Sequence, residues 1–360
     1  MSHREDTEEE RVIIILHMTE KQWITLLDVI NGKEHSPLPV GFIIDSPWLP
    51  KWYGIKIIDY FSNDELWLKA NLHAMNTFPE IIFLPGFWSE YGMCSEPSAF
   101  GSINSFPENE FPHAKKFIHS VEDISRVTKP NPRTDGLAPF LTNRLMLNRN
   151  KIEDAGHKIY FSVSRGPLNV ATHLMGVTEF LTLMMMEPDK VHHLLKIITE
   201  YLVEWHYLQK ELIPTIDGIL VLDDIIGFVG EEEFVEFGLP YFKTLFRRDI
   251  SVKFLHNDAD CRASLKYLPE MGVNLFNMGF DIPLNELKSL TGNKITMLGN
   301  IPPRDILANG TEDQVRDEVK KLIEKLDNKS RVIASCGGGM PPDVNNKNIE
   351  AFYNAVHKYS

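Results

Sequence analysis

The stretch SVKFLHNDADC (residues 251–261) joins a short apolar run to a row of side chains that can bind metal ions. Residues 252–255 predict a buried strand, and His256, Asp258, Asp260 and Cys261 follow its last apolar residue. A segment of the same shape, RVIASC (331–336), lies far downstream and is followed by three glycines. Whether these two strand ends meet in space decides which chemistry the chain can perform.

Working outward from this stretch, the whole chain predicts eight short apolar strands that alternate with helices. The strands are expected at 40–45, 81–88, 158–164, 218–224, 252–255, 273–277, 294–300 and 331–335. Helices are expected among others at 188–212, 231–247 and 262–271, and capping-box patterns precede the helices that begin near Thr19, Ser62 and Thr311. Residues 1–35 are interpreted as an N-terminal helical extension, and residues 89–135 as a long irregular insertion after the second strand.

Eight strands alternating with helices are typical of a single parallel (β/α)8 barrel of TIM type, here one domain over residues 1–360. The strands are continuous apolar runs, as expected of strands that are buried on both faces. A doubly wound open sheet is the alternative, because sequence alone does not show that a barrel closes. No glycine-rich dinucleotide fingerprint follows any of the strands, which favours the barrel.

Composition excludes several classes of partner. The formal net charge is −13 and Lys and Arg form no cluster, so we expect neither nucleic acid nor membrane as a partner. The three cysteines, Cys94, Cys261 and Cys336, are far apart and do not form a disulfide framework. Together with an N-terminus that has no apolar signal region, they predict a cytoplasmic protein.

In a barrel of this type, active sites collect at the C-terminal ends of the strands. The expected strand ends place there Asp45, Trp88, Arg165, Asp223, Asp224, His256, Asp258, Asn300 and Cys336, with Trp48 shortly after the first of them. His256, Asp258 and Cys336 are competent metal ligands, and a catalytic zinc site needs three such ligands and an open position. These residues also have simpler interpretations. His256 could be a satisfied polar residue at a strand end, and Cys336 a buried residue before a turn. Asp223–Asp224 could be a solvated helix start or groups that orient His256.

These strand ends resemble the uroporphyrinogen decarboxylase superfamily, and within it the zinc-dependent, corrinoid-linked methyltransferases. The resemblance is strongest in KFLHND (253–258), in LGNIPP (298–303) with GTEDQV (310–315), and in SCGGGMPPD (335–343) with Asn348. It implies a (β/α)8 barrel with an N-terminal extension. Members of the methyltransferase branch hold zinc with a His-x-Cys pair and a distant Cys, so His256 and Cys336 are the implied ligands.

The middle ligand position of that motif is Asp258 in this chain, where the resemblance implies a cysteine. The third ligand is therefore Asp258, Asp223 or Asp224, unless zinc is absent. The decarboxylase branch fits less well, because its members carry an arginine-rich N-terminal motif for a porphyrinogen with eight carboxylates. Before residue 60 this chain has only Arg4 and Arg11, and a polyanion needs a cluster of cations.

The resemblance implies one zinc ion, a separate corrinoid protein as partner, and exchange of a methyl group with its cobalamin. A site with few thiolates is a harder Lewis acid, so we expect demethylation of a methyl ether or a similar small substrate. Asp223, Asp224 and Asn300 are the expected catalytic residues, and Asp45, Trp48, Trp88 and Arg165 the expected substrate contacts. Arg165 could equally form an internal salt bridge, and the tryptophans could pack the barrel. Transfer from a methyl-corrinoid protein to a thiol or a folate, and a non-catalytic corrinoid-protein-binding relative, are the alternatives.

Overall fold

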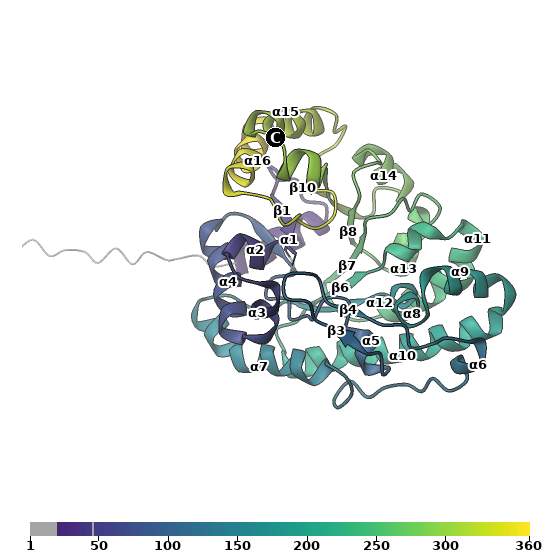
Figure 1. Ribbon diagram of the computed structural model, residues 1–360. Helices are drawn as coiled ribbons and strands as arrows, with labels where there is room; N and C mark the ends of the chain where they lie inside the picture. Colours follow the sequence, from purple (N-terminus) through teal and green to yellow (C-terminus); the bar gives the residue numbers. More distant parts are fainter. Residues whose placement is uncertain (1–19, 45–46) are drawn as a thin grey trace, which may run out of the picture.

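Strands form the centre of the computed structural model, which describes residues 20–44 and 47–360 (Figure 1). The strands are β1 (Gly41–Ile43), β2 (Ile82–Leu84), β3 (Asn104–Ser105), β4 (His113–Ala114), β5 (Phe161–Arg165), β6 (Gly218–Leu222), β7 (Val252–Asn257), β8 (Leu275–Met278), β9 (Thr296–Ile301) and β10 (Val332–Cys336). The eight expected strands are all present as β1, β2 and β5 to β10. Asp45, at the end of the expected first strand, lies outside the described residues.

The eight strands are parallel and run in sequential order around the molecule. Six of them form one sheet in the order β10-β9-β8-β7-β6-β5, and β1 pairs with β2. Parallel bridges from Val40 to Ala334 and from Ile43 to Gly339 attach β1 to β10. The protein is thus an α/β protein with a parallel sheet, and in the described ranges its strand pairings end at β2 on one side and β5 on the other.

An inner apolar cluster lies between the eight strands and helix α1 (Glu20–Ile30). Every one of these strands contributes to it, and α1 adds residues from below the strands. Its members are Trp23, Leu26, Val29, Ile30, Ile43, Ile82, Leu84, Tyr160, Phe161, Leu220, Val252, Phe254, Leu275, Leu298 and Ile333. Residues that alternate with these, such as Ile219 and Val221, pack in the outer core against the helices. Both faces of the strands are therefore buried, as the continuous apolar runs predicted.

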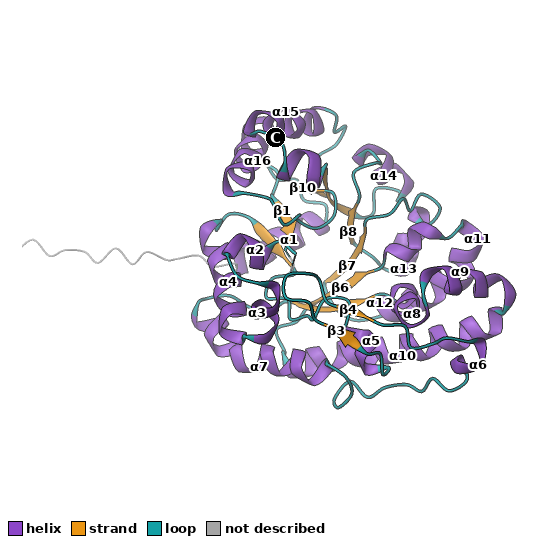
Figure 2. Ribbon diagram, viewed as in Figure 1, coloured by secondary structure: helices purple, strands orange, loops and turns teal. Residues whose placement is uncertain are grey.

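Helices connect the strands and surround them (Figure 2). The remaining α-helices are α2 (Leu49–Tyr53), α3 (Ile57–Ser62), α4 (Asp64–Thr77), α5 (Ser95–Ala99), α6 (Val121–Ile124), α7 (Ala138–Asp154), α8 (Pro167–Met175), α9 (Val177–Met186), α10 (Pro188–Leu212), α11 (Glu231–Glu233), α12 (Leu239–Phe246), α13 (Leu268–Met271), α14 (Leu284–Leu290), α15 (Glu312–Glu324) and α16 (Asn346–Tyr359). Segments η1 (Asp224–Phe228) and η3 (Leu265–Tyr267) are 3₁₀ helices, and η2 (Phe234–Gly238) and η4 (Pro303–Ala308) are π-helices.

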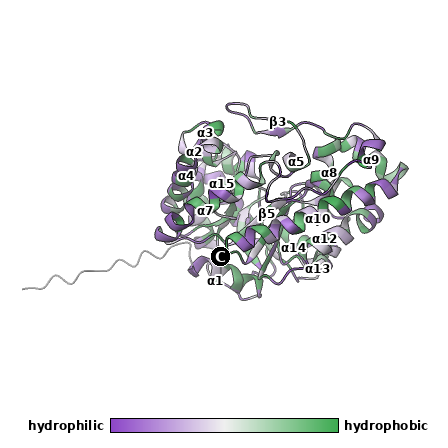
Figure 3. Ribbon diagram, turned by 90° about the horizontal axis from the view of Figure 1, so that it is seen from below, coloured by the Kyte–Doolittle hydropathy of each residue, from purple (hydrophilic) through white to green (hydrophobic). Residues whose placement is uncertain are grey.

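Helix α10 illustrates how the sequence pattern positions these helices. Its buried residues recur every three or four positions, from Val191 through Ile198 and Trp205 to Gln209. Such spacing gives a helix one apolar face, and that face packs on the strands. The mixture of hydrophobic and hydrophilic colours along α10 in Figure 3 reflects the same division.

Several helix boundaries differ from those expected. The region 231–247 is divided into α11, η2 and α12, because Pro240 has no N–H to continue an α-helical hydrogen-bond ladder. Only 268–271 of the expected helix 262–271 is α-helical, with η3 before it and Pro269 in its first turn. The cap near Ser62 is Asn63, whose side chain accepts from the N–H groups of Glu65 and Leu66. The capping box at Thr311 is confirmed.

The insertion 89–135 contains more order than expected. It holds α5, α6 and the antiparallel pair β3–β4, and further along the chain Phe117 and Ile118 both donate their N–H groups to the carbonyl of Leu174 at the end of α8. Glu96 of α5 binds Arg165 at the C-terminal end of β5. The insertion is therefore fastened to the end of the sheet where the candidate site lies.

Candidate metal centre

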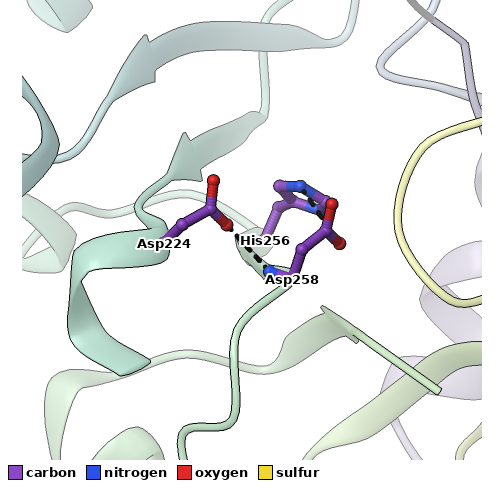
Figure 4. Close-up of side chains that lie close together, drawn as sticks. All are labelled: Asp224, His256 and Asp258. Carbon is purple, nitrogen blue, oxygen red and sulfur yellow. Dashed lines mark hydrogen bonds and ion pairs between the residues drawn. The ribbon is translucent and has the colours of Figure 1, made fainter. Parts of the chain in front are cut away.

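The candidate site lies where β6 and β7 end. His256 is the fifth residue of β7, and its register partner in β6 is Leu222. Asp258 and Asp224 each come two residues after this pair. Because parallel strands end at the same edge of a sheet, the register brings the three side chains together, as Figure 4 shows.

The geometry of these three residues suits a divalent cation. One ligand atom from each of Asp224, His256 and Asp258 lies within 4.8 Å of the other two. Nε2 of His256 is 3.6 Å from Oδ1 of Asp258, and the Asp258 N–H donates to Oδ1 of Asp224 at 2.8 Å. The imidazole is buried, whereas Asp258 is half exposed. Two carboxylates and one imidazole thus converge, and Asp258 is the more exposed of the His256–Asp258 pair.

Asn277 of β8 contacts the imidazole of His256, and no role was expected for it from the sequence. Its Oδ1 lies 2.8 Å from Nδ1 of His256, and its amide nitrogen donates to the carbonyls of Leu298 and Cys336 at 2.7 and 3.5 Å. Asn277 is completely buried. The one signal in the sequence was its position as a polar residue at the end of the apolar run 273–277. A buried amide needs hydrogen-bond partners, so an asparagine at such a strand end indicates a specific contact.

Asp223 is buried, which excludes the solvated helix start considered for it. Its carboxylate accepts from the backbone N–H groups of Leu168, Asn169 and Ile225, at the starts of α8 and η1. Gly166 leaves the space for this carboxylate, since a Cβ there would overlap Asp223. Burial, and to a lesser extent the charge of Asp224, raises the pKa of Asp223 to about 8, against the opposing effect of the three N–H donors. The backbone N–H of Asp223 donates to the carbonyl of His256, so Asp223 also helps to hold the backbone of the candidate ligand His256 in place.

Cys336 is the last residue of β10 and is fully buried, with Sγ 3.7 Å from the carbonyl oxygen of Gly338. Gly338 itself lies against the candidate metal-binding group of Asp224, His256 and Asp258, because a Cβ on it would be 2.5 Å from Oδ1 of Asp258. The two strand ends singled out in the sequence therefore do meet. Among the described residues, the converging group consists of Asp224, His256 and Asp258, and Cys336 is not part of it.

The other predicted site residues are engaged in packing and internal pairing. The amide nitrogen of Asn300 donates to the carbonyls of Gly279 and Ile282 and holds the loop after β8. Trp48 and Trp88 are buried, and Trp48 donates to the carbonyl of Val344. Their roles as substrate contacts stay predictions.

Arg165 forms the internal salt bridge that the sequence left open. Its guanidinium lies 3.2 Å from Glu96 and 3.9 Å from Glu90, and all three side chains are buried. Buried charges of this kind need such partners. A substrate carboxylate would have to compete with two carboxylates already present.

The fold and the site together define a parallel α/β protein with a metal-capable group at the carboxyl ends of its strands. The model of the uroporphyrinogen decarboxylase (URO-D) family matches residues 24–359, and the chain belongs to this enzyme family. Uroporphyrinogen decarboxylase of Pseudoalteromonas translucida is 24% identical over 279 residues, which cover 73% of this chain and 76% of that protein. The same enzyme of Methylobacillus flagellatus is 23% identical over 324 residues, covering 84% and 86%.

A solved structure described as a methyltransferase from Methanosarcina mazei has the same fold. It superposes with a TM-score of 0.78 at 18% identity and covers 93% of this chain and 98% of its own. In residues 20–44 and 47–360, no helix combines the length and the apolar character that crossing a bilayer requires.

Proposed function

We propose that this protein is a metal-dependent methyltransferase that moves a methyl group from a small methylated substrate, such as a methyl ether, to the cobalt of a separate corrinoid protein. The observation that carries the proposal is the convergence of Asp224, His256 and Asp258 at the carboxyl ends of β6 and β7. The fold likeness to a methyltransferase at a TM-score of 0.78 supports it.

The three residues would hold one zinc ion, which when bound supplies a Lewis acid for the oxygen that loses its methyl group. Their donor set of two oxygens and one nitrogen is harder than a thiolate set and favours an oxygen-containing substrate. The chain does the positioning: Asn277 orients His256, Gly338 leaves room for Asp258, and Asp223 holds the starts of α8 and η1 beside the site.

A uroporphyrinogen decarboxylase activity fits the chain less well, although the curated relatives carry that name. Arg4 and Arg11 are the only arginines among residues 1–60, and two arginines are too few to bind a substrate with eight carboxylates. Transfer from a methyl-corrinoid protein to a thiol or tetrahydrofolate stays the second candidate. It is favoured by Cys336, whose strand end reaches Asp258 through Gly338 and could add a soft ligand.

We also infer that the eight strands close into a (β/α)8 barrel. The support is the inner apolar cluster, to which all eight strands contribute. The edge of β5 that faces away from β6 is covered by the side chains of Gln209 and Trp205 of α10, which bind the Val163 backbone, so closure there does not require a hydrogen-bonded ladder.

Metal analysis of the purified protein tests the proposal first. We expect one equivalent of zinc in the wild type and its loss in His256→Ala and Asp258→Ala. Asp260→Ala is the matched control, because Asp260 is two residues away and equally exposed (52% against 53%) but lies outside the group. Equal metal content in all four proteins would refute the site.

Activity is then measured in both directions. Demethylation of candidate ethers is assayed with Co(I) corrinoid protein, and methyl transfer from methylcobalamin is assayed with thiols and tetrahydrofolate. Zinc-dependent ether demethylation supports the proposal, whereas transfer to thiols alone would select the second candidate. Turnover of uroporphyrinogen by the wild type would overturn both.

A further inference from the structure

We propose that Asn277 is a positioning residue that fixes which ring nitrogen of His256 carries the proton and thereby presents Nε2 to the metal site. The proposal deepens the function proposed above and rests on His256 as a ligand. Neither nitrogen of a neutral imidazole is favoured enough by the ring itself to decide which one binds a metal, so a partner of the other nitrogen decides it.

The orientation of the Asn277 amide is determined by its own partners. One end of the amide lies 2.7 Å from the carbonyl oxygen of Leu298 and 3.5 Å from that of Cys336. Both are acceptors, so this end must be the NH2 group. The opposite orientation would place Oδ1 against two carbonyl oxygens in a fully buried position, where repulsion is not screened by water. The amide oxygen therefore faces His256.

An oxygen that can only accept requires a donor opposite it. Nδ1 of His256, 2.8 Å away, must carry a proton, and in the neutral ring Nε2 then carries the lone pair. Nε2 is the nitrogen that lies 3.6 Å from Oδ1 of Asp258 on the side where the three ligands converge. The tautomer is thus set by a chain of contacts that begins at the backbone of β9 and β10.

An amide suits this position better than a carboxylate for reasons of charge. The converging group already holds two carboxylates, Asp224 and Asp258, which together balance one divalent cation. A third carboxylate at 277 would leave an excess negative charge in a buried position, where charges are costly. It would also lack the N–H groups that bind Leu298 and Cys336. The neutral amide orients the ring without adding charge.

Asn277 also joins the ends of four consecutive strands. Its backbone belongs to β8, and its side chain contacts His256 of β7, Leu298 of β9 and Cys336 of β10. The ring orientation and the position of the Cys336 strand end are therefore set by one side chain. A change at 277 should affect the ligand even when the three metal-binding residues are intact.

The experiment records long-range ¹H–¹⁵N spectra of histidine-labelled protein, free of metal, at a pH where the rings are neutral. The His256 signals are identified by their absence in His256→Gln. We expect the Nδ1–H tautomer in the wild type and its retention in Asn277→Asp, which keeps an acceptor. In Asn277→Leu, of similar size but without polar atoms, we expect the Nε2–H form to become populated and the affinity for Zn²⁺ and Co²⁺ to fall by about 10- to 100-fold.

Asn274→Leu is the matched control, since Asn274 makes similar bonds to Lys253 and Ser251 at the far end of the same strands. It should leave the tautomer and the affinity unchanged. An Nε2–H tautomer in the wild type, or an unchanged tautomer in a folded Asn277→Leu, overturns the proposal. If the tautomer responds as expected but the wild type binds no metal, the positioning role stands and the proposed function fails.

Discussion

Gly338 packs directly against the carboxylate of the candidate ligand Asp258. It has a φ of +76°, and the position of its missing Cβ lies 2.5 Å from Oδ1 and 2.9 Å from Oδ2 of Asp258. Two independent reasons therefore require glycine here: a left-handed backbone and a carboxylate that occupies the space of a Cβ. Glycine at this position allows the β10 loop to close over the candidate ligand.

Gly338→Ala should weaken metal binding by at least about tenfold, in the range seen when groups that support a ligand are altered. The methyl group must displace the Asp258 carboxylate or the loop. The left-handed backbone adds a loss of stability of about 1–2 kcal/mol. Isothermal titration with Zn²⁺ and thermal unfolding measure the two effects separately.

Gly54→Ala provides the control for this prediction, because Gly54 has a φ of +83° and open space around the position of its Cβ. It should lose similar stability and keep its metal affinity. A Gly338→Ala protein that binds zinc as tightly as Gly54→Ala would show that Asp258 does not depend on this contact.

The residue scale also shows what sequence could and could not predict about the site. His256 and Asp258 could be selected because each follows an apolar run at a recognisable strand end. Asn277 could not, because its role depends on the register that pairs it with His256. Asp224 was one of three options for the third ligand, and only the start of η1 after β6 decides that it faces the group while Asp223 is buried.

Among the elements, the outer edge of β5 is stabilised by side chains. Along a parallel strand, the N–H and C=O groups of successive residues point alternately to the two neighbouring sides. Tyr160 and Gly166 form backbone hydrogen bonds on the β6 side. Val163 is three residues from each of them, so its N–H and C=O point to the opposite side. There Gln209 of α10 accepts from the Val163 N–H at 3.0 Å and donates to its carbonyl at 3.1 Å. Trp205 donates to the same carbonyl. The amide of Gln209 thus replaces a neighbouring strand.

Gln209→Leu should destabilise the protein by about 1–3 kcal/mol, because it leaves the partly buried Val163 N–H without its acceptor. Hydrogen exchange should accelerate at Val163 more than at β6 or β7. Gln209→Glu keeps an acceptor oxygen and should retain most of the protection. Equal exchange rates at Val163 in wild type and Gln209→Leu would mean that another group covers this edge.

The same helix contact contains a buried histidine that makes stability depend on pH. His206 is fully buried, with its two ring nitrogens 2.8 Å from the hydroxyls of Ser162 and Ser164. Burial, with a smaller contribution from Arg248, lowers the pKa of His206 well below its usual value. As the pH falls through about 6.5, the unfolded chain takes up a proton there that the folded chain does not, so stability falls.

Urea unfolding between pH 7.5 and 5 should therefore show a steeper loss of stability in the wild type than in His206→Gln. Below pH 6 the difference in slope should approach about 1.4 kcal/mol per pH unit. His193→Gln is the control on the same helix, since His193 is exposed to water in the folded chain as well. Parallel curves for wild type and His206→Gln would indicate that His206 is protonated in the folded protein.

At the scale of the whole molecule, the strand count was predictable and the arrangement of the layers was less so. Each inner strand is a short apolar run because both of its faces are buried, and such runs can be recognised one at a time. Helices α2 and α3 lie between β1 and α4, and α8 and α9 lie between β5 and α10. They were not predicted, because no strand in the sequence separates them from the longer helix that follows. The side chains that cover the β5 edge are invisible to any local pattern, since Gln209 and Val163 are 46 residues apart.

The carboxyl ends of the strands carry the candidate metal site, whereas α1 contributes to the stability of the inner cluster. Substitutions in α1 test whether these two functions are independent. Helix α1 packs its buried face, Trp23, Leu26, Val29 and Ile30, into the inner cluster. Trp23 stacks on Tyr160 with ring centroids 4.3 Å apart, just before β5 begins. Helix α1 therefore packs on the inner cluster that all eight strands share, whereas the candidate metal-binding group lies at the carboxyl ends of β6 and β7.

Leu26→Ala should lower the free energy of unfolding by about 2–5 kcal/mol, because Leu26 is 1% exposed and its removal leaves a cavity among several strands. Ile24→Ala, on the exposed face of the same helix, should change it by less than about 0.5 kcal/mol. Zinc affinity should be equal in both variants and the wild type, measured well below the unfolding transition. A loss of zinc affinity in folded Leu26→Ala would show instead that packing of α1 affects the ligand geometry at the carboxyl ends of the strands. The inner cluster would then transmit strain along the strands.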